Sequence, residues 1–299
     1  MSRAIVLVNP RSRSGGRAPI DRIFRAFRDA GWTAELWAGE GLDWVAEATQ
    51  RAVALGVEAV FGAGGDGLLA AMLPALVERE VALGVVPLGT GNVWARELEL
   101  PLDLEGAIAA QLACQPARVD LGRANGRLFL VIASVGFDAQ IVGLVEAGSK
   151  ALGQLAYPLA GVALAGAVRG VRCRIRFDDE PPRELELLAG LATNGRLYGG
   201  LVALVPEARL DDGLLDVVVF EGSGRTDAAA HVARVLAGTH RGSRGVVAAR
   251  VRRLQVESLG PPVPVQTDGD PRGTTPLQVE VLPRALLALG YAARGQAGG

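Results

Sequence analysis

Two glycine-rich turns follow strand-like segments and could together bind a phosphate chain. The first reads GAGGDG over Gly62–Gly67, and the second reads PLGTGN over Pro87–Asn92. Glycines let backbone N–H groups approach an anion closely, and a helix that begins at such a turn adds partial positive charge. Asp66 could hold a magnesium-bound water or a ribose hydroxyl. A bare glycine turn is the plain alternative for each segment, but two such turns on adjacent strands would face one site.

A third candidate lies directly after the first strand-like segment. Asn9-Pro10 is followed by the small residues of Ser14–Gly16, and Arg11, Arg13 and Arg17 add positive charge. Small residues there would let backbone N–H groups contact an anion. An ordinary loop between a strand and a helix is the alternative.

The first half of the chain must position these turns, and it alternates strand and helix signals. A continuous apolar run predicts a strand buried on both faces at Ala4–Val8, and further strands are predicted at Thr33–Trp37, Val57–Phe61 and Val81–Val86. Helices are predicted at Pro19–Ala30, Asp43–Leu55 and Gly67–Glu78. In the first of these helices, Ile20, Ile23, Phe24 and Phe27 form one predicted apolar stripe. The alternation predicts a parallel, doubly wound α/β sheet whose ligands lie beyond the carboxyl ends of its strands.

The pattern changes after about Val119, where strands follow one another with few helices. Strands are predicted at Leu128–Ser134, Arg172–Phe177, Glu184–Thr193, Leu215–Phe220, Ala249–Ser258 and Leu277–Val281, with helices at Leu152–Arg169 and Asp227–Leu236. This order predicts a mostly antiparallel, β-rich second domain. We therefore expect two domains: residues 1–120, completed by residues 284–299, would bind nucleotide, and residues 121–283 would bind the other substrate.

Composition excludes several classes of function. The net charge of −1 gives no basic field for nucleic acid. The two cysteines lie outside any CxxC motif and there are only two histidines, so neither a cysteine-built zinc site nor a disulfide framework is expected. Lys150 is the only lysine, so an active-site cation is expected to be an arginine. With no secretory signal, cytoplasm is the expected compartment. Residues 151–168 carry no formal charge, and Pro158 favours a buried or membrane-facing helix over a membrane span.

Several separated segments resemble the diacylglycerol-kinase catalytic family, which includes sphingosine kinases, ceramide kinases and bacterial lipid kinases. In the first half these segments are VNPRSRSGGR, GGDG and PLGTGNVWARELELP. In the second half they are Ala133–Val142, Thr193–Phe220 and Val265–Pro271. The resemblance covers almost the whole chain in the family's order. It implies a kinase in which ATP lies in a cleft between two domains and a lipid hydroxyl accepts the γ-phosphate.

The resemblance also implies roles for individual residues. The nucleotide-binding residues would be Asn9, Gly64, Gly65, Asp66, Gly67, Thr90, Gly91 and Asn92. Asp268 would be the catalytic aspartate that takes the proton from the acceptor hydroxyl, since a carboxylate can orient an alcohol for in-line attack. Asp66, Asp138 and Asp270 would form a network with Mg²⁺-bound water. An Asp268-Gly269 hairpin turn without a catalytic role is the alternative.

The family also holds a structural metal in the loop that matches residues 209–214. By resemblance, Asp212 would ligate it through its side chain, and Arg209 and Leu214 through their backbone carbonyls. The alternative is an ordinary turn built from Asp211-Asp212-Gly213.

The chain departs from the family's pattern at several positions. Leu68 stands where members usually carry threonine, Val93 where many carry aspartate, and Asp270 where glutamate is common. Two alternatives therefore stay open: an NAD kinase-like enzyme, which shares GGDG, and a nucleotide- or lipid-binding protein with weakened catalysis. The expected cofactors are ATP, or another nucleoside triphosphate, and Mg²⁺. The expected partners are a lipid substrate and a transiently contacted inner-membrane surface, with no nucleic acid, and a homodimer is left open.

Overall fold

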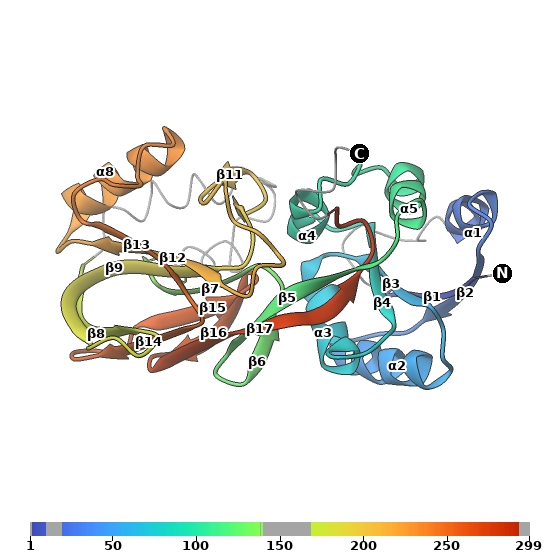
Figure 1. The fold of residues 1–299 in the computed structure, drawn as a ribbon, viewed down its shortest axis with the longest axis horizontal. Helices are drawn as coiled ribbons and strands as arrows, with labels where there is room; N and C mark the ends of the chain where they lie inside the picture. Colours follow the sequence, from blue (N-terminus) through green and yellow to red (C-terminus); the bar gives the residue numbers. More distant parts are fainter. Residues whose placement is uncertain (1, 10–19, 138, 140–168, 293–299) are drawn as a thin grey trace. The chain divides into compact units, whose positions relative to one another are not determined.

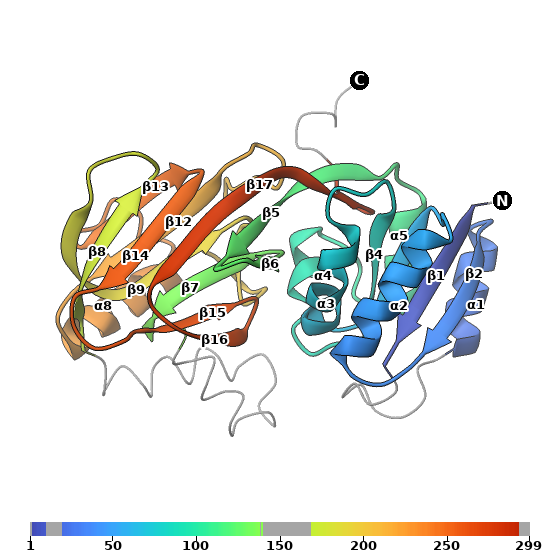
Figure 2. The same ribbon diagram turned by 90° about the horizontal axis from the view of Figure 1, so that it is seen from below.

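The computed structural model describes residues 2–9, 20–137, 139 and 169–292. The chain divides into two compact units: unit 1 comprises residues 1–121 with 283–299, and unit 2 comprises residues 122–282. Each unit is built around its own sheet region (Figures 1 and 2). The predicted helix at residues 152–169 lies almost wholly outside the described residues. Among those that are described, no helix is long and apolar enough to cross a membrane.

Unit 1 is a parallel sheet between two layers of helices, as predicted. Its strands are β1 (Arg3–Val8), β2 (Thr33–Ala38), β3 (Ala59–Gly64) and β4 (Ala82–Pro87), in the order β4-β3-β1-β2. Its helices are α1 (Ile20–Asp29), α2 (Leu42–Ala54), α3 (Asp66–Leu76), α4 (Val93–Glu97) and α5 (Leu104–Leu112). Figure 1 shows α2 and α3 on one face of the sheet and α1 and α5 on the other. Strands β1, β3 and β4 are almost wholly buried, and their sequences are nearly continuous apolar runs, whereas the edge strand β2 is partly exposed.

Helix α1 turns only half of its predicted apolar stripe toward the sheet. Ile23 and Phe27 are fully buried, and the Phe27 ring meets the edge of Phe61 with centroids 4.8 Å apart. Ile20 and Phe24 are each 41% exposed, so the prediction of a single buried stripe is wrong for these two residues. Ile20 and Phe24 form a second i, i+4 row beside the first, and the rotation of the helix carries that row away from the sheet.

The edge of β4 is completed by a side chain. Gln111 of α5 is fully buried, accepts a hydrogen bond from the Val85 N–H at 2.8 Å and donates one to the Val85 carbonyl at 2.7 Å. Strand β17 (Leu277–Ala288) pairs with β4 only through Ala288 and Leu83. Gln111 therefore satisfies backbone groups that a neighbouring strand would otherwise bond.

Unit 2 is a mostly antiparallel β structure, again as predicted. Its strands, with those that it shares with unit 1, are β5 (Ala117–Ala124), β6 (Arg127–Phe129), β7 (Ile132–Gly136), β8 (Val171–Phe177), β9 (Arg183–Thr193), β10 (Leu197–Tyr198), β11 (Val202–Ala203), β12 (Leu215–Glu221), β13 (Val246–Val251), β14 (Arg253–Ser258), β15 (Pro264–Thr267), β16 (Asp270–Thr274) and β17. Helix α8 (Arg225–Leu236) joins β12 to β13. The long β9 pairs with β8 through its first half and with β7 through its second half.

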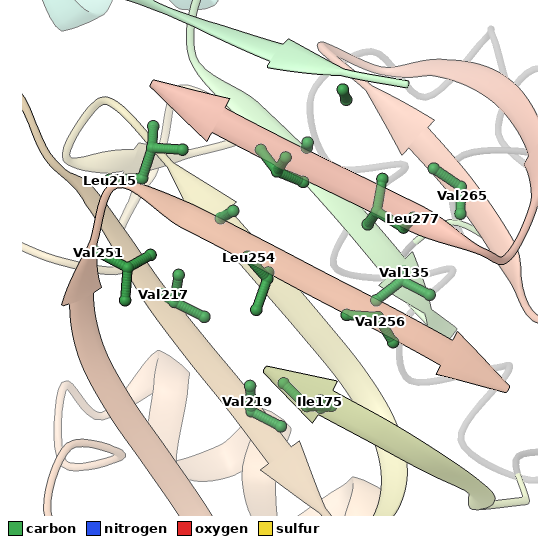
Figure 3. Close-up of a cluster of buried hydrophobic side chains, with 14 of the residues drawn as sticks. Val135, Ile175, Leu215, Val217, Val219, Val251, Leu254, Val256, Val265 and Leu277 are labelled. Carbon is green, nitrogen blue, oxygen red and sulfur yellow. The ribbon is translucent and has the colours of Figure 1, made fainter. Parts of the chain in front are cut away.

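The core of unit 2 lies between these strands. Figure 3 shows Val217 and Val219 of β12, Leu254 of β14, Ile175 of β8 and Val135 of β7 in one cluster, and all five are at most 2% exposed. Burial of such β-branched and aliphatic side chains is the main favourable term that stabilises the unit.

Two predicted strands are interrupted in the structure. The predicted strand at 128–134 is two strands, β6 and β7, joined through Leu130 and Val131, and the predicted strand at 249–258 is split between β13 and β14 at Arg252. In both cases the backbone N–H groups at the break bond to an aspartate carboxylate instead of a strand: Asp268 in the first case and Asp178 in the second.

Candidate functional site

The two glycine-rich turns of unit 1 pack directly against each other. Strands β3 and β4 are parallel neighbours with Gly64 beside Pro87, and the Leu88 N–H donates to the Gly64 carbonyl at 3.1 Å. A Cβ atom added to Gly89 would lie 2.5 Å from the Cα of Gly65, closer than any real contact. Glycine at position 89 is therefore required by this close approach of two backbones.

Asn92 closes the second turn on itself. Its side chain accepts a hydrogen bond from the Gly89 N–H and donates one to the Gly89 carbonyl, both at 2.9 Å. Its backbone is left-handed, with φ of 47°, a conformation that asparagine tolerates better than most residues. Asn92, which is predicted to contact the nucleotide, therefore also holds the loop in its shape.

Asp66 joins the first turn to the helix that follows the second. One carboxylate oxygen accepts the Val93 N–H and the other accepts the Trp94 N–H, both at 3.0 Å. Burial raises the pKa of the Asp66 carboxyl, while these backbone hydrogen bonds and the charge of Arg96 act in the opposite direction. Each oxygen keeps a second lone pair, so the carboxylate can still accept a hydrogen bond from a metal-bound water or a hydroxyl.

All of the predicted nucleotide-binding residues lie at the carboxyl edge of the unit 1 sheet. Asn9 directly follows β1, whose last residue Val8 pairs with Ala63 of β3. The remaining residues are in the turns just described: Gly64, Gly65, Asp66, Gly67, Thr90, Gly91 and Asn92. Most of the arginine-rich segment after Asn9 lies outside the described residues.

Leu68, which replaces the threonine of the family pattern, points into the unit rather than toward the edge. It is 6% exposed, and its methyl groups cover the backbone of β3 where Gly62 and Gly64 have no side chains. A Cβ added to Gly62 would lie 2.6 Å from Leu68 Cδ2. The leucine is thus a core residue, and the hydroxyl that the family pattern places here is replaced by apolar packing.

The Asp268-Gly269 segment is a two-residue hairpin turn between β15 and β16. Both residues have positive φ, 47° and 89°, and Thr267 pairs with Asp270 across the turn. This is the geometry of a type I′ turn, so the hairpin interpretation is correct for the backbone. It does not exclude a role for the side chain.

The Asp268 carboxylate is held by three backbone donors from the break between β6 and β7. It accepts the N–H of Leu130 at 2.6 Å, of Val131 at 2.9 Å and of Ile132 at 3.0 Å. The Asp268 N–H in turn donates to the Ile132 carbonyl at 2.9 Å. A carboxylate bound by three N–H groups is fixed in position and in rotamer, which is what a group that orients a substrate hydroxyl needs.

Asp270, the second carboxylate of the turn, is ion-paired. Its side chain lies 2.8 Å from Nη2 of Arg272, which also donates to the Thr267 hydroxyl from its Nε. Both partners are about one-third exposed at most, with Asp270 at 35% and Arg272 at 27%. The predicted network partner Asp138 lies outside the described residues, so the network of Asp66, Asp138 and Asp270 stays a prediction.

The predicted metal loop is closed by an arginine in the structure. One oxygen of Asp212 accepts the Leu214 N–H at 3.1 Å, and the other pairs with the guanidinium of Arg250. Arg250 faces Asp216 across the β12–β13 ladder, with its Nε 3.6 Å from that carboxylate. Burial raises the pKa of Asp216, Arg250 lowers it and Asp212 raises it further.

In this arrangement the Arg250 guanidinium takes the place that a divalent cation would need on one oxygen of Asp212. Mg²⁺ requires several oxygen ligands in near-octahedral geometry, and a guanidinium against the same carboxylate competes with it. Arg209 uses its Nε to bond Asp211 at 3.1 Å, and no group of three metal-ligating acids, histidines or cysteines occurs in the described part of the chain. The metal ligands Arg209, Asp212 and Leu214 remain a prediction from resemblance.

Two arginines near these sites were not singled out by sequence reasoning. Arg96 lies four residues after Asn92 and donates to the Gly91 carbonyl at 3.1 Å. Its place inside the PLGTGNVWARELELP segment was a signal that could have found it. Arg250 gave no such signal, because its pairing with Asp212 and Asp216 depends on the register of β12 and β13.

Solved structures share the fold of this chain. A Bacillus anthracis structure described as a diacylglycerol kinase superposes with a TM-score of 0.81 at 23% identity, covering 97% of each chain. An NAD kinase from Archaeoglobus fulgidus, solved in complex with ATP, gives a TM-score of 0.52 at 11% identity. At these identities the structures show the fold alone.

The sequence comparisons are more specific. Residues 3–124 match the diacylglycerol kinase catalytic domain, and residues 131–290 match the YegS C-terminal NAD kinase beta sandwich-like domain. The Pseudomonas aeruginosa protein named "Probable lipid kinase YegS-like" is 36% identical over 241 residues, covering 79% of this chain and 78% of its own length. The Mycobacterium tuberculosis diacylglycerol kinase is 29% identical over 298 residues, covering 97% and 95%. The chain belongs to the diacylglycerol kinase catalytic-domain family of lipid kinases.

Proposed function

We propose that the protein transfers the γ-phosphate of ATP to a hydroxyl group of a lipid, with Asp268 as general base. The observation that carries the proposal is the pairing of two preorganised features. Unit 1 has two glycine turns packed at one sheet edge, and unit 2 has a carboxylate fixed by three backbone N–H groups. The first suits a phosphate chain and the second suits an attacking alcohol.

In the proposed reaction, the lipid hydroxyl oxygen attacks the γ-phosphorus while the bond from that phosphorus to the β–γ bridging oxygen breaks. ADP leaves with that oxygen, and the hydroxyl proton passes to the Asp268 carboxylate. Because the carboxylate cannot rotate away from its three donors, its remaining lone pairs keep one direction toward the alcohol. The turns around Asp66 and Asn92 would hold the phosphates still for in-line transfer.

The proposal includes Mg²⁺, which would neutralise charge on the phosphate oxygens during transfer. Asp66 is suited to hold a metal-bound water, since each of its oxygens has one lone pair not used by Val93 or Trp94. The ion pair with Arg272 occupies one oxygen of Asp270, so its other oxygen would join the network. Asp138 would complete the predicted network.

A second candidate function is nucleotide or lipid binding with little turnover. Leu68 favours it, because a buried leucine stands where the family pattern supplies a hydroxyl near the phosphates. An NAD kinase-like reaction is the third candidate, supported by the shared fold alone.

The acceptor is proposed to be diacylglycerol or a related lipid, which the protein would reach by transient contact with the inner surface of the cytoplasmic membrane. The names of its relatives support a lipid acceptor. A role in phospholipid biosynthesis is part of the proposal. A homodimer is compatible with the proposal.

Labelled ATP, Mg²⁺ and purified protein, incubated with mixed micelles of diacylglycerol, phosphatidylglycerol, a sphingoid base or undecaprenol, test the proposal directly. NAD in a parallel reaction tests the NAD kinase alternative. We expect label in one lipid and none in NAD. Binding of ATP without label in any acceptor would favour the binding protein, and labelled NADP would overturn the lipid assignment.

A further inference from the structure

The carboxyl edge of the unit 1 sheet carries an arginine that the predicted site lacks. Arg96 is half-buried on α4, and its Nε donates to the Gly91 carbonyl in the second glycine turn. Asp66 of the first turn accepts the Val93 and Trp94 N–H groups of the same helix, and the charge of Arg96 lowers the pKa of its carboxyl. The arginine therefore lies beside both turns that are proposed to hold the phosphates.

Arg96 has no carboxylate at ion-pair distance in the described part of the chain, and Asp66 acts on it only at longer range. Four arginines of unit 1 pair with carboxylates there: Arg3, Arg22, Arg28 and Arg118. A half-buried guanidinium with no carboxylate in direct contact keeps its Nη groups available, so its position beside two glycine-rich turns points to an anionic ligand.

The hydrogen bond to Gly91 has its own electrostatic consequence. A turn that binds phosphate works through its N–H groups, and a carbonyl directed at the same phosphate would repel it. The Nε of Arg96 ties the Gly91 carbonyl to α4. The guanidinium still has four N–H groups on its two Nη atoms, arranged in a fork that matches two phosphate oxygens.

We propose that Arg96 is a phosphate-binding residue for the nucleoside triphosphate, holding the Gly91 carbonyl aside with Nε and contacting phosphate oxygens with its Nη groups. This inference rests on the proposed use of ATP and assigns a cation to that site. The contribution of Arg96 to binding affinity should then depend on the number of phosphates in the ligand and not on the nucleoside.

Titration calorimetry with ATP, ADP, AMP and adenosine in wild-type protein and in Arg96→Ala tests the proposal. We expect the dissociation constant for ATP to rise roughly tenfold to a hundredfold, the range for lost charge-assisted hydrogen bonds. The rise should shrink from ATP to AMP, and adenosine, measured by competition, should bind unchanged. Arg79→Ala, which removes an exposed arginine of the same unit, is the matched control and should leave all four affinities unchanged.

Arg96→Gln separates binding from loop structure, because an amide N–H can replace Nε at the Gly91 carbonyl but cannot bind phosphate as a cation. We expect it to lose as much ATP affinity as Arg96→Ala while keeping wild-type stability. Equal losses for ATP and adenosine, or full ATP affinity in Arg96→Gln, would overturn the assignment. Wild-type protein that binds no ATP would overturn the proposed function as well, so the two failures are distinguishable.

Discussion

Replacing Asp268 with asparagine should lower the stability of unit 2 as well as remove a base. Asparagine has nearly the same shape and accepts the positive φ of this position, so the backbone of the turn is not strained. The change acts on the three N–H groups that the carboxylate now accepts, from Leu130, Val131 and Ile132. All three residues are at most 7% exposed, so water does not readily replace a lost acceptor.

The magnitude follows from those three bonds. The amide of asparagine has one acceptor oxygen, so at least one N–H faces an NH₂ group and loses its partner, which costs about 2 kcal/mol. The other bonds change from charge-assisted to neutral and weaken by roughly half. Asp268 is itself partly exposed, so water can offset part of these losses. We therefore expect the unfolding free energy to fall by about 3 kcal/mol. For a domain of this size that corresponds to a decrease in Tm of roughly 6–12 °C.

Asp178 provides a matched control elsewhere in unit 2. It also has a positive φ, of 48°, and its carboxylate accepts two backbone N–H groups, from Arg252 at 2.8 Å and Arg253 at 2.7 Å. Both donor residues are exposed, so Asp178→Asn should cost only about 1 kcal/mol. If Asp268 is the base, Asp178→Asn should keep full turnover, whereas Asp268→Asn should lose it at a temperature where both variants are folded.

Calorimetry and lipid phosphorylation on the same samples decide between the two roles. An unchanged Tm in Asp268→Asn would refute the backbone-donor argument. Wild-type turnover in that variant, once shown to be folded, would refute the general base. Equal loss of activity in both variants would mean that turnover reports stability and not proton transfer.

Three further changes test other parts of the molecule. Leu68→Thr should lower the unfolding free energy by about 2 kcal/mol in urea denaturation, because it leaves a cavity and buries a hydroxyl; higher turnover despite this loss would mark the leucine as a regulator of activity. Arg250→Ala should lower the Tm and make it rise on addition of Mg²⁺, whereas wild-type Tm should not respond to EDTA; a wild-type loss in EDTA would favour the predicted structural metal. At pH 8 a thiol reagent should modify the exposed Cys114 and spare Cys173 until the protein unfolds, because burial raises the pKa of Cys173 to about 11; rapid reaction of two thiols would contradict this.

The sequence was sufficient to predict the parallel sheet and the edge at which the site lies. Buried strands on both faces of a sheet show as apolar runs, so β1, β3 and β4 were visible, and parallel strands bring their carboxyl ends together. The same logic could not show that the backbones of Gly65 and Gly89 pack together. A Cβ added to Gly89 would lie 2.5 Å from the Cα of Gly65, and this closeness depends on the spacing of two loops, which the sequence does not give.

Other features depend on contacts that periodicity does not encode. At the break between β6 and β7, the N–H groups of residues 130–132 donate to the carboxylate of Asp268. Asp268 lies more than 130 residues later in the chain, so the sequence around the break does not reveal it. The sequence shows that Leu68 departs from the family motif, but it does not show where the leucine side chain points. Its inward rotamer depends on the missing side chains of Gly62 and Gly64 on the neighbouring strand.

Asp66 and Asp268, the two carboxylates most closely tied to the proposed reaction, are held by the same physical device. Each accepts backbone N–H groups from a segment distant in sequence, two from the start of α4 for Asp66 and three from the β6–β7 break for Asp268. Backbone donors fix a carboxylate without neutralising it as an arginine would, so its charge and remaining lone pairs stay available to a ligand. Asp270 and Asp212 show the contrasting arrangement, in which a guanidinium occupies the carboxylate. This difference in partners is the physical reason to assign the chemistry to Asp66 and Asp268 before the other two.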